Sequence, residues 1–200
     1  MAWREEVARV RRAAFADQEY WGRPVPGFGD PDARVLVLGL APAAHGANRT
    51  GRVFTGDRSG DWLFASLHRT GYANQPTSRS AGDGLTLTGL WIAAAVRCAP
   101  PANKPTPAER DACLPFAREE LALLARVSVI VCLGAFAWDA ALRIVGADVR
   151  PRARFGHLAE ARVGVHTLIG SYHPSQQNTF TGKLTEPMTD AVFSRARELT

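Results

Sequence analysis

The chain has 200 residues, 46% of them hydrophobic, which is enough for one α/β domain with a complete core. Lys and Arg outnumber Asp and Glu by 24 to 19, and the net charge of +5 favours an anionic partner. No apolar run is long enough for a membrane span, and the charged start lacks the apolar stretch of a signal peptide, so we expect a cytoplasmic protein without a membrane segment.

The first half of the chain begins with an amphipathic, Arg-rich pattern that predicts a helix over residues 4–19. A Gly/Pro-rich loop over 20–32 leads to a strand over 34–38, whose continuous apolar run is typical of a buried parallel strand. A helix over 60–70 follows, with Asp57 or Ser59 as its cap. The next residues, 73–86, are polar and rich in turn formers.

The second half of the chain continues the alternation of strands and helices. Thr106, Pro107 and Glu109 form a helix start, with Thr as the cap, Pro at the first helical position and Glu three residues after the cap. The predicted elements are a strand over 90–96, a helix over 106–125, a strand over 127–133, a helix over 136–145, a strand over 165–169 and a helix over 186–199.

This alternation predicts an α/β fold, specifically a three-layer sandwich with a central four-stranded parallel sheet flanked by helices. We find no repeat and no linker, so residues 1–200 are expected to form a single domain. The loops after the first, second and fourth strands all leave carboxyl ends. They should therefore meet at one edge of the sheet, where open α/β sheets bind ligands.

Two short segments stand in those loops. Residues 39–57, GLAPAAHGANRTGRVFTGD, follow the first strand with small residues and then polar ones. The second segment, His173-Pro174-Ser175, follows the fourth strand. Together with the intervening RCAPPAN of residues 97–103, and in this order along nearly the whole chain, they resemble the uracil-DNA glycosylase superfamily. The amino-acid sequence of the first loop is similar to that of the fifth family, also called type B.

The resemblance implies an enzyme that flips a deaminated base out of the DNA helix and cuts its bond to the sugar. Phe54 is then the expected stacking platform for the base, although a Phe in this position is also a common core residue. His173 is expected to donate a hydrogen bond to the departing base, where negative charge develops. Gly39, Ala41 and Pro42 are expected to line the same base pocket.

The residue that positions the attacking water is less evident from the sequence. The glycosylase families generally place a polar residue in the first loop, but Leu40 and Ala41 stand there, as in the fifth family. The resemblance favours Asn103 as the water ligand, with Asp57 close behind because a carboxylate also stabilises a sugar cation. The structural alternatives are a turn residue for Asn103 and a helix cap for Asp57.

Specificity and DNA contacts are also implied by the resemblance. Ala94 stands where related families carry an Asn that recognises the uracil edge, which predicts a broader range of bases, with hypoxanthine and modified cytosine as candidates. The alternative is a small core residue in a strand. Polar side chains in the two loops are the expected phosphate and groove contacts, namely Arg49, Arg52, Ser175, Gln177 and Asn178.

The cysteines suggest part of a cofactor site. Cys98 and Cys113 resemble one half of the four-cysteine iron–sulfur (4Fe–4S) site of the fourth and fifth families, while Cys132 lies in an apolar run and is expected in the core. Those families carry the other pair ahead of a stretch like residues 2–6. We favour a natural start upstream of Met1 over a truncated chain or a lost cluster; a zinc site is the weaker alternative.

The sequence therefore predicts a monofunctional uracil-DNA glycosylase that acts as a monomer on damaged DNA. Backbone cleavage would need a Schiff-base lysine, and Lys104 has no such role in the family. Two alternatives stay open at this point. One is a non-catalytic damage-binding module on the same fold, and the other is an unrelated nucleotide hydrolase, which would need a carboxylate cluster for metal that the sequence lacks.

Overall fold

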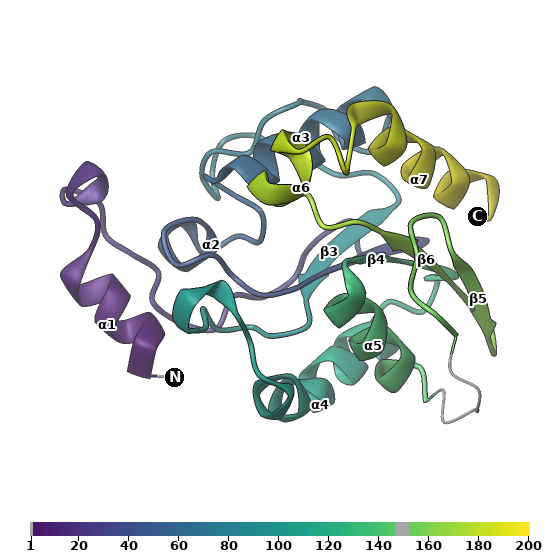
Figure 1. Cartoon of the computed structure of the whole chain (residues 1–200), viewed down its shortest axis with the longest axis horizontal. Helices are drawn as coiled ribbons and strands as arrows, with labels where there is room; N and C mark the ends of the chain where they lie inside the picture. Colours follow the sequence, from purple (N-terminus) through teal and green to yellow (C-terminus); the bar gives the residue numbers. More distant parts are fainter. Residues whose placement is uncertain (1, 147–152) are drawn as a thin grey trace.

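The computed structural model describes residues 2–146 and 153–200, and its centre is one six-stranded sheet (Figure 1). The strands lie in the order β1-β3-β2-β4-β6-β5. Neighbours among β3, β2, β4 and β6 pair in parallel, whereas β1 and β5 pair antiparallel at the two edges. The strands are β1 (Phe28–Gly29), β2 (Val35–Gly39), β3 (Leu90–Ala94), β4 (Val129–Leu133), β5 (Glu160–Val163) and β6 (His166–Ser171).

The predicted three-layer sandwich and its four parallel strands are confirmed, but the sheet is mixed because of the two edge strands. β1 is only two residues long and carries no alternation that a sequence pattern would reveal. β5 joins β6 through the two-residue turn at 164–165, where Gly164 adopts a φ of 58°. That turn is a hairpin signal which the prediction did not use.

Helices cover both faces of the sheet (Figure 1). On one face α3 (Arg58–Arg69) and α7 (Glu186–Glu198) pack on Val35 and Val37 of β2. On the other face α4 (Pro107–Leu123) and α5 (Ala135–Ile144) pack on Leu36 and Leu38 of the same strand. Alternate residues of a strand point to opposite faces, so a continuous apolar run is what a sheet buried on both sides requires.

Most predicted helices are present with small shifts at their ends. The expected capping box of α4 is formed, with Thr106 Oγ1 accepting from Glu109 N and the Glu109 carboxylate accepting from Thr106 N. The N-terminal helix is the exception: α1 (Ala2–Val10) stops where Arg11 adopts a φ of 59°, and only the short η1 (Ala13–Phe15) follows. A left-handed residue cannot continue an α-helix, so the single helix predicted over 4–19 is wrong.

Three further short elements belong to the loops, namely α2 (Ala47–Thr50), η2 (Pro101–Asn103) and α6 (Gln176–Phe180). They follow β2, β3 and β6 respectively, so they sit at the carboxyl ends of three parallel strands, two of which are neighbours. In Figure 1 these segments gather on one side of the sheet. None of the helices in the described residues combines the length and apolar character needed to cross a membrane.

Candidate functional site

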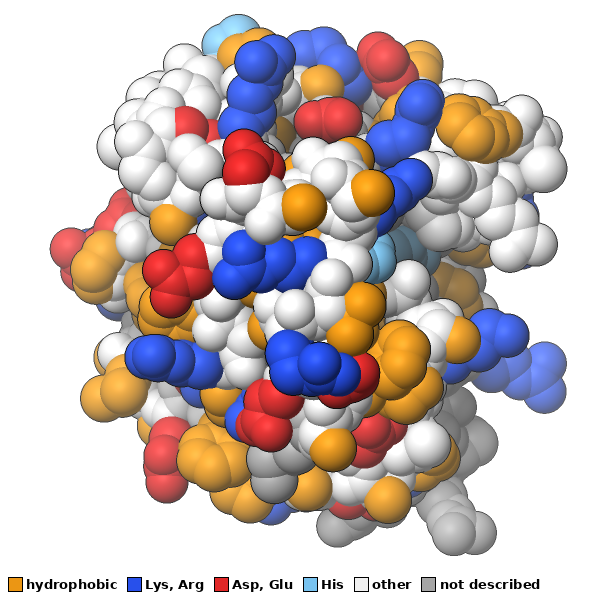
Figure 2. Space-filling model, turned by 90° about the vertical axis from the view of Figure 1, so that its left-hand side faces the viewer, with side chains coloured by type: hydrophobic (Ala, Val, Ile, Leu, Met, Phe, Trp, Pro, Cys, Tyr) orange, Lys and Arg blue, Asp and Glu red, His pale blue; other side chains and the backbone are white. Residues whose placement is uncertain are grey.

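A pocket of roughly 400 Å³ opens at this edge of the sheet. Its walls come from the loops after β2, β3 and β6 and from the start of α3, as the sheet order requires. Figure 2 views the molecule from this side and shows Lys and Arg side chains spread over the surface among acidic ones. The lining residues are Leu40, Ala41, Ala43, Val53, Phe54, Asp57, Arg58, Ser59, Ala94, Asn103, His173, Ser175 and Gln176.

Phe54 supplies a flat apolar wall. Its backbone has a φ of 53°, which is unusual for an aromatic residue and marks local strain. The glycine at the end of β2 makes room for the ring, because a Cβ on Gly39 would lie 2.6 Å from Phe54 Cε2. The Phe54 ring centroid is 6.1 Å from that of His173, so the two expected functional rings stand side by side.

The backbone of His173 is fixed by two hydrogen bonds to its carbonyl oxygen. The Asn178 side chain donates to the His173 carbonyl oxygen at 2.9 Å, and Ser175 N donates to the same oxygen at 2.8 Å. Burial lowers the pKa of His173 to about 4. The imidazole is therefore neutral at physiological pH and presents one N–H donor and one acceptor nitrogen.

Asp57 caps the helix that borders the pocket. Its Oδ1 accepts from Gly60 N at 2.9 Å, and its Oδ2 lies where a Cβ on Gly46 would be 2.2 Å away. Burial raises the pKa of Asp57, while the hydrogen bonds from Gly60 and Ser59 and the charge of Arg49 act in the other direction. A carboxylate in this setting combines the role of cap with a partly desolvated negative charge beside the pocket.

Asn103 reaches the pocket from the loop after β3. It and the preceding Ala102 have φ values of 55° and 52°, so two successive residues adopt the left-handed conformation. Asn103 Oδ1 accepts from Ala44 N at 3.2 Å, which ties this loop to the loop after β2. The side chain is exposed at the pocket rim, where an amide can orient a water molecule.

Ala94, at the end of β3, lines the pocket, whereas Gly39, at the end of β2, is not among the lining residues although it was expected there. Gly39 and Ala94 are partners in the parallel register, and Ala94 is buried. Ala41 lines the pocket, whereas Pro42 is buried and is not among the lining residues. Among the described lining residues, no amide side chain stands at the end of β3.

The side chains of four of the five expected DNA contacts make intramolecular hydrogen bonds, among them Ser175, whose Oγ accepts from Asn178 N at 3.4 Å at the start of α6. The Arg49 guanidinium donates to His45 O, Gln18 Oε1 and Gly56 O and stacks on the Phe15 ring at 4.0 Å. Arg52 is buried against Asp83, and Asn178 supports His173 as described above. Gln177 is exposed on α6.

The pocket is also lined by Arg58, Ser59 and Gln176, for which the sequence predicts no role in catalysis. Among the described lining residues, Arg58 is the only one with a Lys or Arg side chain. It is exposed, and its guanidinium lies 4.7 Å from the centroid of the Phe180 ring on α6. The signal available in the sequence was its position directly after the cap of α3, at the mouth of a ligand loop.

The cysteines do not assemble a metal site in the described residues. Cys98 Sγ accepts from Arg4 Nη1 at 2.7 Å, and Cys113 lies partly buried on α4. Cys132 is fully buried in β4, where burial strongly raises the pKa of its thiol. No group of three His, Cys, Asp or Glu side chains suited to a metal occurs in the described part of the chain. With three cysteines in its sequence, the chain by itself supplies fewer thiolates than a four-thiolate cluster needs.

Comparisons with known proteins agree on one family. The model of the uracil-DNA glycosylase superfamily matches residues 26–197. A type-5 uracil-DNA glycosylase of Mycobacterium bovis is 58% identical over all of this chain and 75% of its own length. One of Thermus thermophilus is 51% identical over all of this chain and 90% of its own length. A type-4 enzyme of Thermotoga maritima is 32% identical over 56% of this chain and 51% of its own length.

Proposed function

Because the chain belongs to the uracil-DNA glycosylase superfamily, we propose that it is a type-5 member that hydrolyses the N-glycosidic bond of uracil in DNA. The observation that carries the proposal is the single pocket shared by Phe54, His173, Asp57 and Asn103. These residues come from the loops after three different strands, and together they offer a stacking surface, a hydrogen-bond donor, a carboxylate and an amide. Those are the groups that glycosidic cleavage requires.

The nucleotide must leave the DNA helix to reach the pocket, which costs a few kcal/mol of lost stacking and pairing. Stacking on Phe54 returns about 1–3 kcal/mol for a flipped base. As the bond between C1′ and the base breaks, its electron pair moves onto the base. The neutral His173 then donates a hydrogen bond to a carbonyl oxygen of the departing base, where the charge accumulates.

Water completes the reaction by adding its oxygen to C1′, and its proton is released or passes to the base. We assign Asn103 to position that water at the pocket rim. Asp57, with a partly desolvated carboxylate, stabilises the positive charge on the sugar. Leu40 and Ala41 are apolar, so neither takes part in water activation.

The small wall formed by Ala94 supports a substrate range wider than uracil. A site built to hydrogen-bond one base edge rejects other bases because its own polar groups would stay unpaired. Ala94 has no such groups, so hypoxanthine and modified cytosines are further candidate substrates. We assign the exposed Gln177 and Arg58 and the pocket-lining Ser175 to contacts with the DNA strand.

The decisive experiment incubates the full chain with a duplex that carries one uracil and measures free uracil and strand breaks separately. We expect release of uracil, an intact backbone until alkaline treatment, and a loss of about 10²–10³ in rate for His173→Ala. The matched control is His68→Ala, an exposed position on the outer part of α3. An inactive wild-type chain that is folded would contradict the proposal.

A non-catalytic damage-binding module is the second candidate, and the apolar Leu40–Ala41 segment is the observation that favours it. The same experiment separates the two candidates. A binding module retains the uracil duplex without turnover, and His173→Ala leaves its affinity unchanged. The enzyme turns over, and the substitution reduces the rate.

The expected iron–sulfur cluster plays no part in these steps. Cys98 and Cys113 supply two of the four thiolates that such a cluster needs. Its presence stays a prediction, which is checked by measuring iron and acid-labile sulfide in the purified protein.

A further inference from the structure

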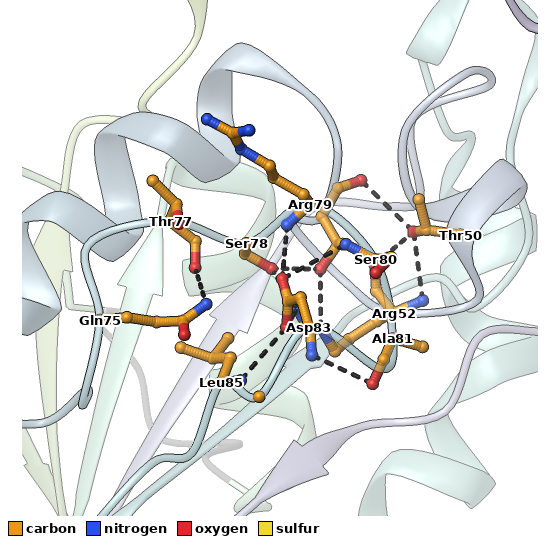
Figure 3. Close-up of polar contacts among 12 residues, drawn as sticks. Thr50, Arg52, Gln75, Thr77, Ser78, Arg79, Ser80, Ala81, Asp83 and Leu85 are labelled. Carbon is orange, nitrogen blue, oxygen red and sulfur yellow. Dashed lines mark hydrogen bonds and ion pairs between the residues drawn. The ribbon is translucent and has the colours of Figure 1, made fainter.

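Arg52 is a buried arginine of the first loop, and its guanidinium lies against a second loop and does not line the pocket. The residue is 7% exposed. Its Nη2 donates to both carboxylate oxygens of Asp83, at 2.8 and 2.9 Å, and to Ser78 Oγ at 2.8 Å. Its Nε donates to Thr55 Oγ1 at 3.0 Å. One guanidinium therefore joins Thr55 of its own loop to a second loop, where it contacts Ser78 and Asp83 (Figure 3).

Asp83 in turn organises the loop over residues 78–85. Its carboxylate accepts from the backbone N–H groups of Arg79, Ser80 and Leu85 at 2.6, 3.3 and 3.2 Å. Burial acts to raise the pKa of Asp83, but the bonds from Arg52 and these N–H groups outweigh it and lower the pKa to about 2. The carboxylate is therefore charged at neutral pH.

The second loop in this network carries the pocket residues. Thr55 and Ser78 are fully buried, and their hydroxyl oxygens are 2.7 Å apart. Gly56 N also donates to Ser78 O at 2.9 Å. Thr55 and Gly56 lie between Phe54, the stacking wall, and Asp57, the carboxylate beside the pocket. The network therefore holds the stretch of chain between two proposed functional side chains, although its own side chains do not line the pocket.

Phe54 needs such support because its φ of 53° is unfavourable for an aromatic residue. Strained backbone persists only where surrounding contacts over-determine it. We propose that the Arg52–Asp83 ion pair is a positioning clamp for base excision, which fixes the 53–57 turn so that the Phe54 ring and the Asp57 carboxylate keep their places in the pocket. The inference rests on the proposed glycosylase function for its kinetic part and on the structure alone for its geometric part.

The fork of the arginine is essential to this role. A lysine at position 52 keeps the positive charge beside Asp83 but cannot reach Thr55, Ser78 and Asp83 in a fixed plane. Arg52→Lys therefore keeps a positive charge beside Asp83 but removes the hydrogen bond that links position 52 to Thr55 in the 53–57 turn. Thr55→Val removes only the hydroxyl that joins the two loops, at nearly constant volume.

The test compares Asp83→Asn, Arg52→Lys and Thr55→Val with Asp190→Asn. Asp190 is a suitable control because it also forms a two-point ion pair, with Arg69 at 2.8 and 2.9 Å, and also accepts from a serine, Ser66. That pair joins α3 to α7 and touches no residue of the pocket. All variants are assayed well below their melting temperatures, with kcat and KM for uracil release measured separately.

A second measurement does not depend on activity. Hydrogen exchange at the Gly56 amide reports how often the 53–57 turn leaves Ser78. We expect the three clamp variants to exchange at least tenfold faster at Gly56 and to lose about tenfold to a hundredfold in kcat. Asp190→Asn should retain both values, and Asp83→Glu should recover part of what Asp83→Asn loses.

The outcomes separate the two levels of inference. If the wild-type chain releases no uracil, the proposed function fails, and the exchange at Gly56 alone decides the clamp. If the clamp variants keep wild-type kcat and Gly56 protection, the clamp is overturned. It is equally overturned if Asp190→Asn loses as much as they do, because the effect is then general loss of stability.

Discussion

At the scale of single residues, the position of Phe54 depends on two neighbouring glycines, Gly39 and Gly60, which have no side chain to collide with it. A Cβ on Gly39 would overlap the ring at 2.6 Å, and a Cβ on Gly60 would lie 1.9 Å from the Phe54 carbonyl oxygen. Both glycines therefore allow the turn that places the ring in the pocket. The sequence contains these glycines but does not reveal why they are needed. For Gly39, the close approach is to Phe54, which lies 15 positions later in the chain (54 − 39).

The substitution Gly39→Ala tests this packing. Gly39 has an ordinary strand conformation, so the added methyl group acts through the Phe54 ring and not through backbone strain. We expect a loss of about 1–3 kcal/mol in the free energy of unfolding and at least a tenfold loss of kcat/KM. Urea unfolding and uracil release measure the two effects. Gly82→Ala is the control, since nothing lies within 4 Å of a Cβ there; equal effects at both positions would refute the argument.

Ala94 is the residue to which we assign the proposed breadth of the substrate range. It is buried at the end of β3 and lines the pocket, so a side chain added there enters the space available to the base. Ala94→Asn should raise the ratio of kcat/KM for uracil over hypoxanthine by about tenfold or more, because the amide pairs with one base edge and stays unpaired with the other. Ala94→Leu adds similar bulk without the amide, and an equal ratio for both variants would mean that size alone decides.

The two arginines of the first loop show what residue-level prediction leaves out. An arginine in a polar loop suggests a phosphate contact, which the sequence predicts for both Arg49 and Arg52. Arg52 instead pairs with Asp83, 31 residues later, and Arg49 with Gln18, 31 residues earlier. Such pairs depend on which loops the fold brings together, and neither hydrophobic periodicity nor a motif contains that information.

At the scale of elements, sequence patterns predicted the four parallel strands and their main helices, because buried strands and capped helices carry strong local signals. The capping box at Thr106 is the clearest example. The short elements α2 and α6 were missed, since four or five residues contain too little periodicity to register. The strands in turn predicted the pocket: their carboxyl ends bring together His173, Ala94 and the 39–57 segment.

At the start of α3, Asp57 caps the helix and is also the residue that we propose to stabilise the sugar cation, and substitution separates the two roles. Asn is as good a helix cap as Asp, so Asp57→Asn should change the free energy of unfolding by less than about 0.5 kcal/mol. It should still lower kcat, because the charge that stabilises the sugar cation is gone. Asp57→Ala should lose about 1 kcal/mol of stability in addition. Thermal unfolding and single-turnover kinetics provide the measurements, and unchanged kcat in Asp57→Asn would show that Asp57 only caps the helix.

At the scale of the whole molecule, partly buried histidines couple stability to pH. Desolvation by burial is the main cause that lowers the pKa of His45, His157, His166 and His173, in the last case to about 4. Each of these residues binds a proton more readily in the unfolded chain, whose histidines titrate near pH 6.5. The unfolded state therefore carries more bound protons below about pH 6.5, and stability must decline there.

We therefore expect the free energy of unfolding to fall as the pH is lowered from 7 to 5, before most carboxylates are protonated. The acidic groups held by arginines, such as Asp83 with its pKa of about 2, lose their contribution only at lower pH. Asp57 acts in the opposite direction, because its raised pKa favours protonation of the folded state. Urea unfolding at half-unit pH steps measures the decline, and His173→Gln should remove about 1 kcal/mol of it at pH 5.5, since its folded and unfolded pKa values differ most. A wild-type curve that stays flat between pH 7 and 5 would contradict the burial of these imidazoles as neutral groups.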